Sequence, residues 1–297
     1  MKRTIGIIEL FITAFIWGTA FVAQSLGMDQ GIGPFTFNAA RYAVGAIVLI
    51  PVILLLDRLL KRKEAEEAPD ITITIKGGIC CGVVLAIASS LQQIGILYTT
   101  VGKAGFGTAL YIIIVPFMAV FLHKKIPGRV WLAAIIAIVG FYLMCVSETL
   151  SLNKGDLLVL LGAFMWSVHI HVVDHFAPRA NGVMMSSIQF AISSLICLTC
   201  SLLFETISVS TLIVGAGPIL YAGVMSCGIA YTLQIVAQQN VEPALACLIM
   251  SLESVVSALA GWVILGETMV VIEIIGCILV FTGVIIAQLP DKKGSEA

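Results

Sequence analysis

Apolar runs long enough to cross a lipid bilayer follow one another along almost the whole chain. Each has about 17–25 residues, the length that a membrane-spanning helix needs, and the ten runs lie at 4–26, 33–56, 76–100, 103–122, 129–146, 155–174, 182–204, 212–237, 244–265 and 269–289. Only 11% of the 297 residues are charged and 60% are hydrophobic, whereas soluble domains carry about 25% charged residues. The pattern predicts an all-α integral membrane protein with ten transmembrane helices.

The first run is predicted to be a helix of the mature fold rather than a signal peptide. It is longer than the apolar core of a signal peptide, and no clear small-residue cleavage site follows it. All eight cysteines lie in apolar runs, so we expect small buried hydrophobic side chains rather than disulfides. The Cys197-x-x-Cys200 spacing lacks polar neighbours and is a weak signal for a redox or metal site.

Lys and Arg are distributed unevenly between the two sides of the membrane that ten spans define. With the N-terminus inside, thirteen of the 16 are cytoplasmic, Lys103 and Lys154 are outside, and Arg41 is intramembrane. Cytoplasmic loops are enriched in Lys and Arg, so this bias favours ten spans and two cytoplasmic termini in the cell (inner or plasma) membrane. The net charge of −1 leaves no basic stripe for nucleic acid.

Short sequence matches recur in the same order in the two halves of the chain. The matched segments are 14–18 with 163–167, 41–42 with 189–190, 91–92 with 233–234, and 138–140 with 281–283. Each half has five spans, an odd number, so the second half enters the membrane from the opposite side. The pattern predicts two inverted-topology repeats around a central cavity, residues 1–148 and 149–290, with a cytoplasmic tail at 291–297.

Glu253 is a single carboxylate inside an otherwise apolar span. It lies nine residues after Ala244, hence about 13 Å from the cytoplasmic end of the span at 1.5 Å per residue. An intramembrane carboxylate costs roughly 2.5–3.5 kcal/mol on insertion scales, so it is a functional-site candidate by default. Apolar surroundings favour the protonated form, which makes Glu253 the candidate for proton coupling. The alternative is a neutral packing residue that is hydrogen-bonded near Ser251, Ser254 and Ser257.

Several other polar or aromatic residues lie in the middle of spans, and the two halves match many of them in pairs. Arg41 keeps its proton, so it needs a polar cavity, a carboxylate or helix-end carbonyls, unless it extends to the outer interface. Mid-span amides need partners inside the bundle, and core packing is the alternative for the mid-span tryptophans. The predicted substrate-binding residues of the cavity are Trp17, Arg41, Gln92, Trp166, His169, Gln189, Gln234 and Glu253.

A histidine-rich cluster ends the sixth span. His171, Asp174 and His175 share a helix face because they are three and four residues apart, while His169 lies on nearly the opposite side. A tetrahedral metal site would need ligands from elsewhere, so we expect neither a metal nor a cofactor. We expect His169 to face the cavity beside Trp166, and the other three to be polar residues at headgroup level. An intramembrane metal-dependent enzyme that uses these three residues remains an alternative, although the Glu of a His-Glu-x-x-His motif is missing.

Several longer motifs carry a family resemblance over essentially the whole chain. They lie at 14–18 (Ala-Phe-Ile-Trp-Gly), 37–42, 91–100, 103–111 with 115–116, 163–169, 251–254 and 265–268. With these motifs the chain resembles the ten-span EamA-type members of the drug/metabolite transporter (DMT) superfamily. The resemblance implies a transporter with a duplicated five-helix layout. One departure is visible, because His-Lys-Lys-Ile at 123–126 stands where the second half has Gly-Glu-Thr-Met at 266–269.

We therefore expect a secondary active transporter, not an enzyme, that exports small organic metabolites such as amino-acid-like or aromatic compounds by alternating access. No Walker A motif occurs in the sequence, which leaves protons or substrate gradients as the driving force. At the predicted cavity the two Trp and the matched pair Gln92 and Gln234 outnumber the charges, so the substrates should be mostly uncharged or zwitterionic and able to stack on indole. A membrane scaffold or receptor is the further alternative, although no loop exceeds about twenty residues. Monomer and dimer both stay open.

Overall fold

The computed structural model describes residues 2–60, 69–98, 101–124, 126–145, 154–266 and 270–288. Within these residues the chain is all-helical and has no strand. The helices are α1 (Lys2–Asp29), α2 (Pro34–Leu60), α3 (Ile71–Ile96), α4 (Val101–Ala109), α5 (Tyr111–Phe121), α6 (Gly128–Cys145), α7 (Lys154–Phe176), η1 (Ala177–Arg179), α8 (Gly182–Phe204), α9 (Val209–Val214), α10 (Ala216–Tyr221), η2 (Ala222–Tyr231), α11 (Thr232–Ala237), α12 (Pro243–Met250), α13 (Leu252–Leu265) and α14 (Val271–Gln288).

Eight helical stretches of the described chain are long and apolar enough to cross a membrane, and α6 and α14 add two shorter apolar helices. These ten stretches follow the ten predicted runs in order. The eighth run, expected at 212–237, differs in detail. Its span covers 216–237, while the short helix α9 precedes it as a separate element. The fold is therefore that of a multi-pass helical membrane protein.

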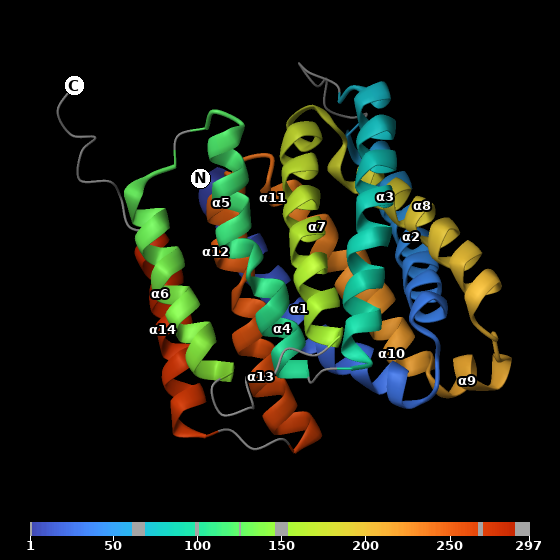
Figure 1. Ribbon diagram of the computed structural model, residues 1–297. Coiled ribbons are helices and arrows are strands. Elements are labelled where there is room, and N and C mark those ends of the chain that lie inside the picture. The colour runs from blue at the N-terminus through green and yellow to red at the C-terminus, as the bar shows by residue number, and fades with distance from the viewer. Residues whose placement is uncertain are drawn as a thin grey trace.

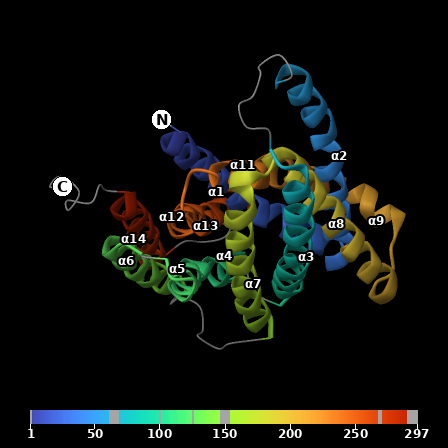
Figure 2. The same cartoon turned by 90° about the horizontal axis from the view of Figure 1, so that it is seen from above.

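The helices form a bundle in which elements far apart in sequence lie side by side. Helix α6 packs along α14, α2 along α8, α3 between α7 and α8, and α1 along α13. Seen from above, α6 and α14 lie at one edge of the bundle, and α2, α8 and α9 lie at the other (Figure 2). The start of α1 and the end of α14 lie at the same end of the bundle (Figure 1). The bundle thus encloses α1, α7, α12 and α13 between two helix pairs.

Local sequence signals explain where several helices begin. Pro34 and Pro243 open α2 and α12, positions where the missing N–H of proline has no intrahelical partner to lose. The side chain of Asp70 accepts hydrogen bonds from the N–H groups of Thr72 and Ile73 at the start of α3. Asn181 caps α8 in the same way. These caps satisfy N–H groups that would otherwise lack partners.

The two halves repeat the same local features at a nearly constant interval. The fourth span of each half is interrupted for one residue, at Leu110 between α4 and α5 and at Ser251 between α12 and α13. A residue with positive φ follows each of these broken spans: His123 (φ 57°) in the first half and Gly266 (φ 70°) in the second. The interval between these two residues equals that between the first residues of α6 and α14. Left-handed backbone is uncommon for a residue other than glycine, so positive φ at matched positions is a distinctive feature that the two halves share.

Close backbone contacts also recur in matched pairs. A methyl group added at Gly140 would lie 2.6 Å from the carbonyl oxygen of Gly276, and one added at Gly283 would lie 2.8 Å from that of Ala133. The interval from Gly140 to Gly283 equals that from Ala133 to Gly276, so a two-fold relation between the halves would convert each contact into the other. Small residues let membrane helices approach closely, and here they do so reciprocally between α6 and α14.

Candidate functional site

A pocket lies in the middle of the bundle. Its walls come from α1, α2, α3, the broken helix pairs α4–α5 and α12–α13, α7, η2 and α11. The lining residues are Trp17, Ala20, Phe21, Gln24, Arg41, Gln92, Thr108, Tyr111, Trp166, Ile170, Ser226, Tyr231, Gln234, Met250 and Glu253. Polar and charged groups therefore gather at one place inside a bundle whose outer surface is apolar.

The pocket contains six of the eight residues that the sequence assigned to a cavity. Trp17, Arg41, Gln92, Trp166, Gln234 and Glu253 all line it. The other two, His169 and Gln189, are fully buried behind the wall, and the Nε2 atom of His169 lies 3.1 Å from the Oε1 atom of Gln189. His169 was expected to face the cavity beside Trp166. It does contact the ring of Trp166, but it supports the wall rather than forming its surface.

Three aromatic rings form one side of the pocket. The ring centroids of Trp17 and Tyr231 are 4.6 Å apart, and those of Trp166 and Tyr231 are 6.0 Å apart. The tilted geometries are those that aromatic pairs prefer. The indole N–H groups of both tryptophans donate to no acceptor among the described residues. The tryptophans thus offer both flat apolar surface and unused hydrogen-bond donors next to the pocket.

Arg41 brings a positive charge to the pocket from α2. The side chain is only 2% exposed, so it does not extend to the outer interface. Its guanidinium group lies 4.8 Å from the ring centroid of Tyr42 and donates a hydrogen bond of 3.0 Å to the hydroxyl of that residue. The described residues offer it no ion pair with a carboxylate, and its Nε atom has no partner. A buried cation without an anion is costly, so this group favours an anionic ligand.

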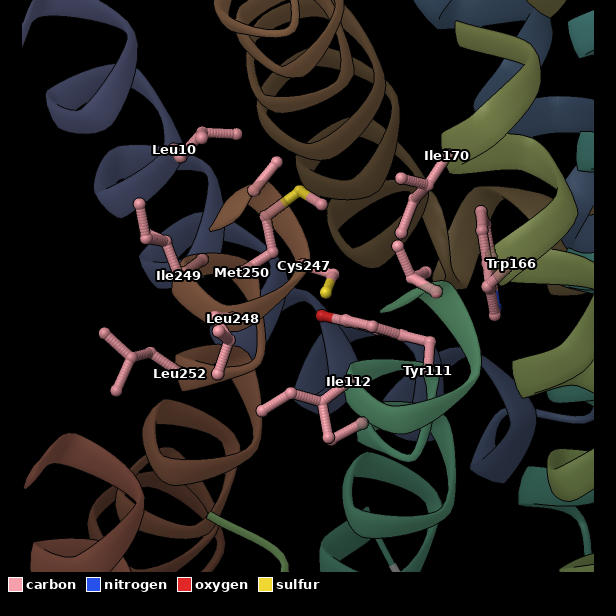
Figure 3. Packing of buried hydrophobic residues seen from close by; sticks show 14 of the residues in the cluster. Leu10, Tyr111, Ile112, Trp166, Ile170, Cys247, Leu248, Ile249, Met250 and Leu252 are labelled. Atoms are coloured by element: carbon pink, nitrogen blue, oxygen red, sulfur yellow. The ribbon is translucent and has the colours of Figure 1, made fainter. Parts of the chain in front are cut away.

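Glu253 brings a carboxyl group from the first turn of α13. It is 3% exposed, and its Oε1 atom accepts a hydrogen bond of 2.9 Å from the hydroxyl of Tyr111. Tyr111 is the first residue of α5, so this bond joins the two interrupted spans directly after their breaks. Figure 3 shows the hydroxyl of Tyr111 extending from α5 towards α12, where it ends near Cys247.

The two matched glutamines line the pocket with different partners. The amide of Gln92 donates to Oγ1 of Thr108 at 2.8 Å, and that of Gln234 donates to Oε1 of Gln238 at 3.0 Å. Gln238 in turn donates to the carbonyl of Ile170 on α7. The Oε1 atom of Gln234 has no partner among the described residues. These amides fix the walls of the pocket and leave at least one free acceptor.

The histidine-rich end of α7 has separate partners for each side chain. His171 is buried, and its Nε2 atom lies 3.0 Å from the carbonyl oxygen of Val115 on α5. Asp174 forms an ion pair with Lys124, and the ring of His175 packs against Phe176. Over the described part of the chain, no three His, Cys, Asp or Glu side chains gather as metal ligands. The contacts of His171 and Asp174 instead join α7 to α5 and to the residues directly after α5, on the side of the pocket where α1 begins and α14 ends.

The described cysteines are all unpaired, Cys197 and Cys200 among them. One expectation about them was wrong, because Cys80 is exposed at the surface of the bundle rather than buried. Buried cysteines such as Cys81, Cys197 and Cys247 pack as small apolar side chains.

Sequence reasoning missed several lining residues, above all Tyr111 and Tyr231. Tyr231 lies three residues before Gln234, so both belong to one helix face, and that spacing was a usable signal. The interval from Tyr111 to Glu253 is the same as the interval from Gln92 to Gln234. The repeat therefore pointed to Tyr111, but a tyrosine in an apolar span does not stand out as a carboxylate does.

Comparison with known proteins places the chain among membrane transporters. A model of the EamA-like transporter family matches residues 4–146 and 153–288. A protein of Archaeoglobus fulgidus named as an uncharacterized transporter is 25% identical over 294 residues, which are 97% of this chain and 87% of that protein. Another uncharacterized transporter, from Clostridium kluyveri, is 22% identical over 100% of this chain and 96% of its own. One crystal structure has a similar fold, with a TM-score of 0.79 at 18% identity over 98% of both chains.

Proposed function

Because the chain belongs to the EamA-like transporter family of the DMT superfamily, we propose that it is a secondary active transporter that exports small zwitterionic metabolites with an aromatic or otherwise flat part. Amino-acid-like compounds are the class that fits best. The observation that carries the proposal is that one buried cation, one buried carboxyl group and the ring cluster of Trp17, Trp166 and Tyr231 line the same pocket.

The charges of the pocket match the two ends of a zwitterion. The guanidinium of Arg41 lacks a carboxylate among the described residues, and guanidinium binds carboxylates with two parallel hydrogen bonds. Glu253, on a different helix, supplies the negative group for a substrate ammonium or for a coupling proton. A substrate that carries both charges leaves the site close to neutral, which reduces the cost of ions inside a membrane.

The rings and amides of the pocket favour a flat apolar body between those charges. Trp17, Trp166 and Tyr231 offer surfaces for stacking. The unused indole N–H groups and the free Oε1 of Gln234 add donors and an acceptor. A multiply charged ion would gain little from these surfaces and would carry charge that the pocket does not balance.

Alternating access follows from an inverted arrangement of residues 1–148 and 149–290. The matched helix breaks, the matched positive φ at His123 and Gly266, and the reciprocal contacts between α6 and α14 support this arrangement. Counting α6 and α14 as spans gives ten, which puts both termini on one side of the membrane, and the Lys and Arg bias favours the cytoplasmic side. Such repeats hold a substrate site at their interface, and the site is exposed to one side at a time.

Transport into liposomes tests this proposal. Purified protein is reconstituted, and counterflow is measured with a panel of labelled tryptophan, tryptamine, indole-acetate and a disaccharide. We expect tryptophan or a related zwitterion to exchange best, with tryptamine and indole-acetate, which each lack one charge, at least tenfold slower. Preferred flux of a multiply charged ion would contradict the proposal.

A variant of Arg41 tests whether this residue binds the carboxylate of the substrate. Arg41→Gln is expected to abolish discrimination between tryptophan and tryptamine, because the partner of the carboxylate is gone. Lys154→Gln is the matched control, since Lys154 lies beside Tyr98 outside the pocket and its loss removes the same charge. Equal effects of the two variants would show that Arg41 acts only through net charge.

A further inference from the structure

Tyr111 and Glu253 are counterparts in the two halves, and they bond to each other. Their interval in the sequence equals that between Gln92 and Gln234 in the neighbouring spans, and each follows the break of its own fourth span. The hydroxyl of Tyr111 donates to Oε1 of Glu253 at 2.9 Å. Two counterparts that touch must lie on the pseudo-two-fold axis that relates the halves, because the rotation exchanges them.

A contact on this axis has a special property during transport. If the halves are inverted repeats, the carrier changes sides when each half takes the conformation of the other. The rotation then carries the contact between residues 111 and 253 onto itself. The pair therefore keeps its contact in both states, whereas a contact away from the axis exists on one side only.

The ion pair between Lys124 and Asp174 is such an off-axis contact. It joins the residues directly after α5 to α7 at the end of the bundle where α1 begins, and the contact between His171 and the carbonyl of Val115 joins the same two helices. Its counterparts are Glu267, which lies outside the described residues, and Ser25 near the far end of α1. When the halves exchange conformations, the Lys124–Asp174 contact opens, and the pocket is closed at its opposite end instead.

We propose that Tyr111 is the positioning residue of Glu253, holding its carboxyl group on the axis in both states of the carrier while the Lys124–Asp174 pair opens and closes. This inference rests on the inverted repeat of the proposed function. It gives the coupling group a fixed place from which both sides of the membrane can be reached in turn. The group therefore changes its access without changing its partner.

Infrared difference spectroscopy tests the bond without any substrate. Reconstituted protein is acidified, and the carboxyl C=O band that disappears in Glu253→Gln is assigned to Glu253. Tyr111→Phe keeps the buried ring but removes the donor, so this band should move to higher wavenumber. The matched control is Tyr221→Phe, which removes another interhelical bond, 2.6 Å long, between Tyr221 and Thr19. It should leave the band of Glu253 in place.

The same spectra are then recorded with the Lys124–Asp174 pair broken. Asp174→Lys sets two positive charges against each other, and its effect is followed in a cysteine-free variant by labelling Ala244→Cys, which lies in the cleft beside Lys124 and Asp174. We expect faster labelling by a membrane-impermeant maleimide and, in this open state, an unchanged shift of the Glu253 band on Tyr111→Phe.

Three results would overturn the inference. The first is no shift of the band in Tyr111→Phe, and the second is a shift in only one of the two states. The third is unchanged labelling at Ala244→Cys, which would mean that the off-axis pair is no gate. A wrong substrate class leaves all three measurements unaffected, so failure of the proposed substrate and failure of this inference are distinguishable.

Discussion

The carboxylate of Glu205, which follows α8, holds the start of α2 in place. It accepts hydrogen bonds of 2.8 Å from the N–H groups of Phe35 and Thr36, and one of 2.7 Å from the hydroxyl of Thr36. Gly33 leaves the room for it, because a methyl group there would lie 2.3 Å from Cδ of Glu205. Helix α2 carries Arg41, so this contact positions the cation of the pocket. We predict that Glu205→Ala and Gly33→Ala are both destabilising, and that they act through the same carboxylate.

The size of the effect follows from the bonds that are lost. Loss of a helix N-cap costs about 0.5–2 kcal/mol, and loss of a negative charge at a helix N-terminus costs about 0.3–1 kcal/mol. Glu205 is partly exposed, so we take about 1–3 kcal/mol in total. With an unfolding entropy of about 2.1 cal/mol/K per residue, this corresponds to a fall in Tm of roughly 2–5 °C for a chain of this length.

A double-mutant cycle in detergent tests the reasoning. Thermal unfolding is measured for each single variant and for the pair, with Gly217→Ala as the control because a methyl group there meets nothing within 4 Å. Once Glu205 is alanine, the methyl group at Gly33 has no carboxylate to displace, so it should cost less than about 0.5 kcal/mol. If Gly33→Ala costs the same in both backgrounds, the two residues are independent and the capping argument fails.

Three further predictions concern transport and topology. Glu253→Gln keeps the shape of the side chain but fixes it neutral, so it should lose pH-driven accumulation and retain a slower substrate exchange without a pH gradient; retained accumulation would leave Glu253 as a packing residue. Cysteines introduced at Ser210 and Asn240, both exposed, should react with impermeant maleimide from opposite faces of the membrane, and labelling from one face would contradict the ten-span model. The charge exchange Lys124→Asp with Asp174→Lys should restore slow labelling at Ala244→Cys, whereas additive effects of the two changes would argue against a direct pair.

The helices and their order could be predicted from the sequence because lipid imposes a simple rule. Every backbone polar group inside a membrane needs an internal partner, so an apolar run of sufficient length becomes a helix, as at 4–26 and 182–204. The candidate site could also be predicted from the sequence, because a charged residue such as Arg41 or Glu253 is costly in lipid and therefore indicates a functional position. The interpretation that these two residues line one pocket required only that the halves pack against each other.

Features that depend on packing were not predictable from composition. The breaks at Leu110 and Ser251 carry no proline or glycine of their own, and they arise where two spans cross the pocket. His169 was expected in the cavity because its spacing places it near Trp166, but Gln189 holds it behind the wall. Spacing along one helix determines which face a side chain lies on. Whether that side chain reaches the surface of the pocket is determined by its contacts with the neighbouring helices.

The π-helical segment η2 shows how the two halves came to differ at the site. A methyl group at Gly82 would approach the carbonyl of Gln189 at 2.8 Å, and one at Gly223 would approach that of Arg41 at 3.0 Å, so the two glycines make matched contacts. The second half holds one more residue between Gly223 and Gln234 than the first half holds between Gly82 and Gln92. The π-helix at Ala222–Tyr231 lies in this interval and accommodates the extra residue, as wider i→i+5 turns do at many functional sites.

This insertion changes which side chains reach the pocket from the second half. Ser226 and Tyr231 both belong to η2 and line the pocket. The same asymmetry holds for the charged positions, where Arg41 corresponds to Gln189 and Glu253 corresponds to Tyr111. Shared features of the halves, such as the helix breaks, fit the two equivalent backbone states that the proposed alternating access requires. The proposed zwitterionic substrate would need unequal side chains at the matched positions as well, because a fully symmetric site would present two cations or two carboxylates to ends that carry opposite charges.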